Sequence, residues 1–132
     1  MRLEGIMKPL RQNEGFNHLL ECMNKGQYPL SAYGLSESGK SYLINGIFEN
    51  RENSIVIVTH SDIEAKNLYE DLSLYSTEVY YFPVREVVFY NIDAISGDLR
   101  WARLKVIKEI LQSKDKKIII TSIDALTSLY TP

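Results

Sequence analysis

Continuous runs of β-branched residues alternate with apolar residues at helical spacing along most of this chain. The run at 54–58 is typical of a parallel strand that is buried on both faces. The segments 78–82 and 117–121 are predicted to be further strands of the same sheet. The extended segment 28–33, which leads into a glycine-bracketed loop, is predicted to be a fourth strand. Because strand alternates with helix, the pattern predicts an α/β fold with a doubly wound parallel sheet and right-handed crossovers.

Apolar residues at helical spacing predict five helices around these strands. Gly26 is expected to end the first helix and Ser122 to cap the last. The inward faces are expected at Phe16, Leu19, Leu20 and Met23; at Leu43, Ile44, Ile47 and Phe48; at Ala65, Leu68, Leu72 and Tyr75; at Leu99, Ala102, Arg103, Val106, Ile107, Ile110 and Leu111 within 98–112; and at Leu126, Leu129 and Tyr130.

Composition and charge bound the class of protein. The chain has 132 residues, of which 45% are hydrophobic and 24% charged, which is typical of one folded domain. Its net charge of −2 disfavours tight non-specific binding to DNA. The single cysteine, Cys22, excludes an internal disulfide and is expected to pack as a small core residue. With no signal peptide and no membrane-spanning stretch in the sequence, a cytoplasmic location is expected.

One motif points to chemistry. Residues 34–41, Gly-Leu-Ser-Glu-Ser-Gly-Lys-Ser, satisfy G-x-x-x-x-G-K-[ST] between a predicted strand and a predicted helix. In such a loop, backbone N–H groups surround a phosphate, Lys40 would reach the β- and γ-phosphates, and Ser41 would offer its hydroxyl to Mg²⁺. The candidate nucleotide-binding residues are Gly34, Glu37, Ser38, Gly39, Lys40 and Ser41.

The rest of an active nucleotide site is harder to find. A carboxylate at Glu37 would repel a polyphosphate by on the order of a few kcal/mol. Asp62 and Asp124 follow predicted strands, where a hydrolase holds Mg²⁺, but both also fall at predicted helix N-termini, which favour Asp in any case. Backbone N–H groups at the helix start still need acceptors, so we expect an anion in the loop or an inward-folded Ser36, Glu37 or Ser38. No catalytic residue and no metal site are predicted.

Other polar and aromatic residues have ordinary structural interpretations. His60 is expected to make surface hydrogen bonds, and His18 is expected to have no acidic or nucleophilic companion nearby. Arg103 falls on an apolar stripe and is expected to pair with Asp98 or Glu86. Core packing is favoured over a nucleobase platform for the aromatic residues Tyr80, Tyr81, Phe82, Phe89, Tyr90 and Trp101.

Several phrases in this order resemble the N-terminal region of the bacterial transcription-repair coupling factors, the Mfd family. After the loop at 34–41 come Asn-Leu-Tyr-Glu-Asp-Leu at 67–72, Tyr-Phe-Pro-Val-Arg-Glu at 81–86, Ser-Gly-Asp at 96–98 and Ile-Ile-Thr-Ser-Ile-Asp-Ala-Leu at 119–126. The resemblance covers nearly the whole chain.

The resemblance implies a fold similar to domain 1a of the repair protein UvrB, and so to P-loop NTPases and superfamily 2 helicases, here incomplete. It implies one truncated domain over 1–132, with an N-terminal helix and lead-in at 1–27 and βα units over 28–132. The segment 84–96 is too short for the long β-hairpin of UvrB. In this family the loop is degenerate, and ATP and Mg²⁺ are used by motor domains farther along the parent protein.

The resemblance also implies a function. The chain would be a non-catalytic UvrB-like module that supports UvrA recruitment, through an adjoining subdomain, and autoinhibition in transcription-coupled nucleotide excision repair. The parent would be an ATP-dependent DNA translocase that displaces stalled RNA polymerase, and its other parts would contact polymerase and DNA. The module is expected to be monomeric, with no membrane partner and no cofactor beyond a possible loop anion. The alternatives are an active P-loop ATPase or kinase that uses Lys40 and Ser41, and a single-strand DNA binder that uses the arginines and aromatic residues.

Overall fold

The computed structural model describes residues 4–85 and 95–127. The chain forms two compact units, Met1–Glu52 and Asn53–Pro132. This boundary differs from the division after residue 27 that the sequence suggests. No described helix is long and apolar enough to cross a membrane.

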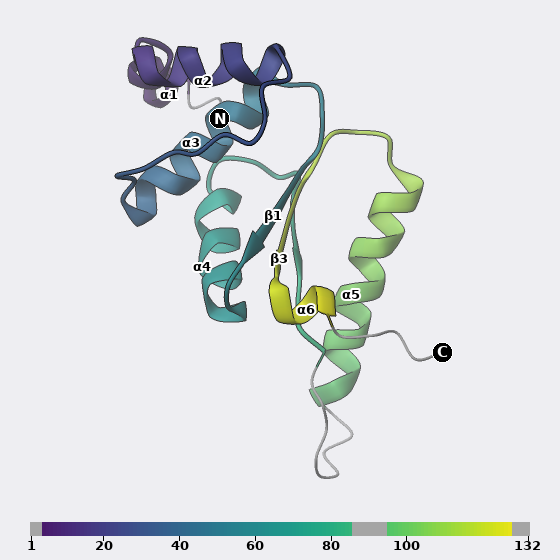
Figure 1. The fold of residues 1–132 in the computed structure, drawn as a ribbon. Coiled ribbons are helices and arrows are strands. Elements are labelled where there is room, and N and C mark those ends of the chain that lie inside the picture. Colours follow the sequence, from purple (N-terminus) through teal and green to yellow (C-terminus); the bar gives the residue numbers. More distant parts are fainter. Residues whose placement is uncertain (1–3, 86–94, 128–132) are drawn as a thin grey trace. The chain divides into compact units, whose positions relative to one another are not determined.

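Three helices make up the described part of the first unit: α1 (Glu4–Arg11), α2 (Glu14–Asn24) and α3 (Glu37–Asn50) (Figure 1). Met7, Phe16 and Phe48 are buried between them. A Cβ added at Gly46 would lie 2.3 Å from Leu10 Cδ2 and 3.1 Å from the Phe16 ring. The missing side chain of Gly46 therefore lets the helices approach closely.

Helix α2 is capped at both ends. The side chain of Asn13 accepts a hydrogen bond from the Phe16 backbone N–H at 3.0 Å. Gly26 has a φ of +69°, its N–H donates to the Met23 carbonyl, and the next N–H donates to the Cys22 carbonyl. The C-terminal cap at Gly26 is confirmed. Helix α1 was not predicted, because Pro9 interrupts its pattern.

The strand predicted at 28–33 is wrong. The structure assigns no strand to this segment, and all six residues are exposed, Tyr33 to 89%. The prediction depended on the glycine-bracketed loop that follows, since a Walker-type loop requires a strand before it. The segment itself contains Pro29, which lacks an N–H for a sheet ladder, and no β-branched residue.

The second unit holds a parallel sheet with strand order β1-β3-β2. Its strands are β1 (Ile55–Thr59), β2 (Val79–Phe82) and β3 (Ile118–Ser122), and its helices are α4 (Asp62–Ser73), α5 (Ile95–Gln112) and α6 (Ile123–Thr127). Figure 1 shows α4 and α5 on opposite faces of the sheet, so the parallel α/β class is confirmed. The described residues contain three strands, however, not the expected four.

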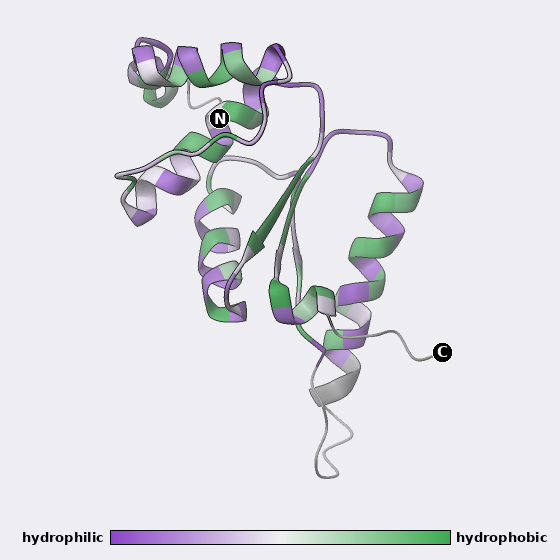
Figure 2. Ribbon diagram, viewed as in Figure 1, coloured by the Kyte–Doolittle hydropathy of each residue, from purple (hydrophilic) through white to green (hydrophobic). Residues whose placement is uncertain are grey.

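The core of this unit lies between the sheet and α4. Ile118 and Ile120 of the central strand are fully buried, as are Ala65 and Leu72 of α4. Strand β1 is hydrophobic along its length (Figure 2), yet Val56 is 61% and Val58 48% exposed, so the expectation of burial on both faces is wrong for β1. The cap at Ser122 is confirmed, because its hydroxyl accepts a hydrogen bond from the Ala125 N–H at 3.2 Å.

The predicted helix ends are close to those observed. Helix α5 begins at Ile95, three residues before the predicted start at Asp98. Three residues that the sequence places on inward faces are exposed, namely Ile110 and Leu111 of α5 and Leu126 of α6. The expected core positions Leu129 and Tyr130 lie outside the described residues.

Candidate site at the start of helix α3

The motif at 34–41 forms a closed helix N-terminus. Helix α3 begins at Glu37, and Ser36 is its N-cap. The Ser36 hydroxyl accepts a hydrogen bond from the Gly39 N–H at 3.1 Å, and the Ser36 carbonyl accepts one from the Lys40 N–H at 3.0 Å. Two backbone donors that a phosphate-binding loop would offer to its ligand are thus used within the protein.

Glycines allow this arrangement at two points. Gly34 has a φ of +76°, a conformation that L side chains rarely adopt, just before the cap. At Gly39 an added Cβ would lie 3.0 Å from the Ser36 hydroxyl. Both glycines of the motif therefore have roles in the turn and the cap.

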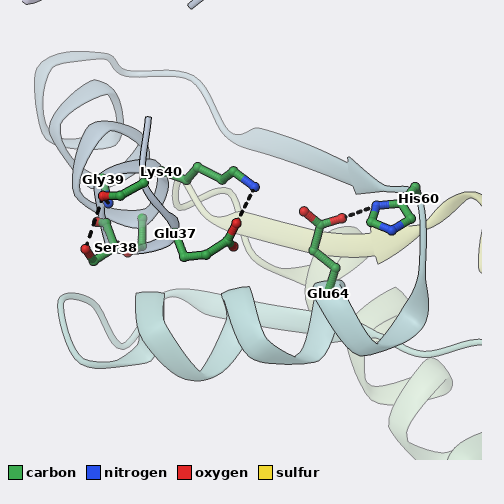
Figure 3. Close-up of polar contacts among 8 residues, drawn as sticks. Glu37, Ser38, Gly39, Lys40, His60 and Glu64 are labelled. Carbon is green, nitrogen blue, oxygen red and sulfur yellow. Dashed lines mark hydrogen bonds and ion pairs between the residues drawn. The ribbon is translucent and has the colours of Figure 1, made fainter. Parts of the chain in front are cut away.

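The Lys40 side chain is paired within its own helix. Its Nζ donates to Glu37 Oε1 at 3.0 Å, one turn earlier on the same helix (Figure 3). The Glu37 side chain is exposed, and a carboxylate in the first turn is favourable beside the positive helix end. The expectation of an inward-folded acceptor is confirmed for Ser36, whereas Glu37 pairs with Lys40 instead.

The two serines of the motif also bond within it. Ser41 is only 2% exposed, and its hydroxyl donates to the Ser38 carbonyl at 3.1 Å. The Ser38 and Ser36 hydroxyl oxygens lie 3.4 Å apart. The structure thus brings all six predicted site residues into one turn and its approach, arranged as a cap.

Asp62 has a structural role in the second unit. Its Oδ2 accepts a hydrogen bond from the Tyr81 hydroxyl at 2.6 Å, and its Oδ1 accepts one from the Val84 N–H at 3.2 Å. Burial, followed by the hydrogen bond to Asp62, raises the pKa of Tyr81 above its usual value. Asp62 therefore ties the start of α4 to the end of β2. It and Asp124 both lie in a first helical turn, as helix-start carboxylates should.

The two histidines lie in different surroundings. His60 is exposed, and its Nδ1 lies 2.5 Å from Glu64 Oε2 (Figure 3), which confirms the expected surface contact. The expectation that His18 lacks a nucleophilic companion is wrong, because its Nε2 lies 3.6 Å from Cys22 Sγ on the next turn. Cys22 is buried, as expected. In the part of the chain that the structure describes, no three potential metal ligands cluster.

Arg103 is buried against the end of β2. Its guanidinium lies 4.1 Å from the centre of the Phe82 ring, and its Nη1 donates to the Pro83 carbonyl at 2.6 Å. Glu86, one of its two expected partners, lies outside the described residues.

The aromatic residues of β2 are half-buried and contact neighbouring helices, so the expected packing is confirmed only in part. The Tyr80 hydroxyl lies within 3.4 Å of carboxylate oxygens of Glu78 and Glu109, and the Tyr81 ring is 5.9 Å from that of Tyr69. Burial and the two carboxylates raise the pKa of Tyr80.

The remaining aromatic residues differ. Trp101 is 73% exposed, so the prediction of core packing is wrong for it, and Phe89 and Tyr90 lie outside the described residues. Trp101 therefore belongs to a surface that the sequence reading assigned to the core.

Comparison with known proteins finds distant relatives among DNA-repair proteins. The chain is 24% identical over 132 residues to the transcription-repair-coupling factor of Bacillus subtilis, a match that covers 98% of this chain and 11% of that protein. It is 21% identical to the UvrABC system protein B of Methanobrevibacter smithii, over 99% of this chain and 22% of the relative. It is 20% identical to the UvrABC system protein B of Methanococcoides burtonii, over 92% of this chain and 20% of the relative.

These matches confirm the resemblance seen in the sequence. The chain is a weak homologue of the coupling factor's N-terminal region and of UvrB over nearly all of its own length. It spans between about a tenth and about a fifth of the relatives' lengths. No family model and no solved structure matches the chain.

Proposed function

We propose that the chain is a non-catalytic UvrB-like module of a transcription-repair coupling factor and acts in nucleotide excision repair. The observation that carries the proposal is the closed start of α3 in a chain whose relatives are repair proteins. In this role the Walker-type motif starts helix α3 but binds no nucleotide.

The electrostatics at the cap support a non-catalytic role. A bound nucleotide would need the Gly39 and Lys40 N–H groups and the Lys40 ammonium, and each already has an acceptor inside the protein. Ser41 is buried with its hydroxyl donated to a carbonyl, so it is poorly placed to hold Mg²⁺. Nucleotide binding would require all of these hydrogen bonds within the protein to be replaced by bonds to phosphate and Mg²⁺.

The partners follow from the same proposal. The module supports recruitment of UvrA through an adjoining subdomain and takes part in autoinhibitory packing. ATP and Mg²⁺ are used by motor domains of the parent, which act on DNA and on stalled RNA polymerase. The fold is proposed to be similar to that of the helicase-like domain 1a of UvrB.

Two assays test this role. The chain with ATP and Mg²⁺ should release no phosphate above background, and Lys40→Ala should change nothing; turnover that Lys40→Ala abolishes would instead indicate an ATPase or kinase that uses Lys40 and Ser41. In the parent protein, deletion of 1–132 with its adjoining subdomain should abolish UvrA binding and leave ATP-driven translocation intact. Unchanged UvrA binding would contradict the recruiting role.

A further inference from the structure

Helix α5 carries an unusually apolar strip on its solvent side. Trp101 is 73% exposed, Leu104 52% and Leu111 79%. Their spacing of three and seven residues puts them on one face of a helix. The opposite face holds Arg103 and Val106, which are buried against the sheet. The strip is therefore not the side of α5 that stabilises the domain.

Three positively charged side chains flank this strip. Arg100, Lys105 and Lys108 are exposed, and at about 100° per residue they fall on the same side of the helix as Trp101. None of the three makes an ion pair with a residue that the structure describes. Glu109 follows Lys105 by one turn, at the edge of this face, and its carboxylate accepts a hydrogen bond from the Tyr80 hydroxyl. The exposed Asp98 lies one turn before Trp101.

We propose that the α5 outer face, defined by Arg100, Trp101, Leu104, Lys105, Lys108 and Leu111, docks an acidic protein partner that presents an apolar groove or helix flanked by Asp and Glu. A central tryptophan with apolar neighbours and a charged rim is the usual make-up of an energetically important interface patch. The anchors span about 15 Å of helix, the length over which helix-in-groove contacts form. The proposal does not depend on the proposed role in repair.

Other occupants fit the face less well. In a symmetric contact with a second copy, the three cations would meet the same three cations, which costs free energy. Single-stranded nucleic acid stacks on aromatic rings, and among the described residues of this face only Trp101 offers one, whereas Leu104 and Leu111 do not stack. A membrane surface needs a broader apolar face than three side chains on a helix already packed on a sheet.

Fluorescence of Trp101 gives a direct test, because it is the only tryptophan in the chain. The probe is a synthetic three-heptad helical peptide with leucine at a and d and glutamate at e and g, where like charges prevent self-association. A matched peptide with lysine at e and g is the charge control. We expect a blue shift and saturable binding with the glutamate peptide only. An oligothymidylate and anionic lipid vesicles are titrated in parallel.

Variants test where the peptide binds and whether the charge of the α5 outer face sets the preference between the two peptides. Leu104→Ser should weaken glutamate-peptide binding by at least about tenfold, and the Lys105→Glu, Lys108→Glu double variant should reverse the preference to the lysine peptide. Ile63→Ser, on the exposed side of α4, is the control and should bind like wild type. All the substituted side chains are exposed, and circular dichroism verifies the fold. Equal binding of both peptides, no reversal, or a Trp101 shift only with the oligonucleotide or the vesicles would overturn the proposal.

Discussion

The Ser36 hydroxyl accepts a hydrogen bond from the Gly39 N–H at 3.1 Å. In a phosphate-binding loop that N–H is kept for the ligand, and a helix that begins two residues later exposes it. Here α3 begins at Glu37, so Ser36 serves as an ordinary N-cap. This one contact accounts for how the motif can persist in sequence without a bound phosphate.

Loss of the Ser36 cap should destabilise the chain. Ser36→Ala removes the acceptor for the Gly39 N–H, and we expect the free energy of unfolding to fall by about 1 kcal/mol. Ser38→Ala is the matched control, since the Ser38 hydroxyl reaches only the Ser36 hydroxyl, at 3.4 Å. Urea unfolding measures both; equal effects of the two substitutions would argue against the cap.

Asp62 and Tyr81 should be energetically coupled. Removing the carboxylate with Asp62→Ala leaves the Tyr81 hydroxyl and the Val84 N–H without their acceptor, and the expected cost is about 2 kcal/mol. Tyr81→Phe should cost about 1 kcal/mol. In the double variant the losses should be less than additive. Additive losses in a double-mutant cycle would show that the 2.6 Å contact contributes no stability of its own.

Stability should also fall at alkaline pH because of Tyr81. The pKa of Tyr81 is higher in the folded chain than in the unfolded chain, whose tyrosines ionise at about pH 10. The contribution is thus complete below pH 10 and is lost as the pH rises above it. Tyr81→Phe should reduce this loss, and Tyr80 should account for part of the remainder, since its pKa is raised too. Melting temperatures between pH 8 and 11 measure the slope, with exposed Tyr33→Phe as the control; an unchanged slope in Tyr81→Phe would contradict this origin.

Gly46 should tolerate no side chain. In Gly46→Ala the new methyl group would meet Leu10 Cδ2 at 2.3 Å, and the expected destabilisation is about 1–3 kcal/mol. Gly5→Ala adds the same methyl to a helix with nothing within 4 Å and should be neutral or stabilising. Shortening the neighbour with Leu10→Ala should make the effect of Gly46→Ala smaller. Thermal melts that rank Gly5→Ala below Gly46→Ala would refute the packing argument.

The second unit was predictable because its signals are local. The run Ile118–Ile120 is β-branched throughout, as a doubly buried strand requires, and Ser122 stands where a cap is needed. The segment 28–33 failed because its assignment came from the neighbouring motif and not from its own residues. Leu111 failed because helical spacing does not fix which side of α5 meets the sheet when both sides carry leucines.

The candidate site was predictable in composition but not in geometry. Glycine, lysine and serine at the motif positions are compatible with both an open phosphate loop and a capped helix. The choice depends on where the helix begins, and a serine followed by Glu37 is itself a helix-start signal. The exposed Trp101 could have been suspected from its spacing to Leu104, opposite the stripe that contains Val106.

Calorimetric titration of ATP with Mg²⁺ into the chain tests the closed cap most directly. Because the Gly39 and Lys40 N–H groups and the Lys40 ammonium already have acceptors, we predict no saturable binding, and the same flat titration for Lys40→Ala. Low-micromolar affinity in the wild-type chain that disappears in Lys40→Ala would contradict the account.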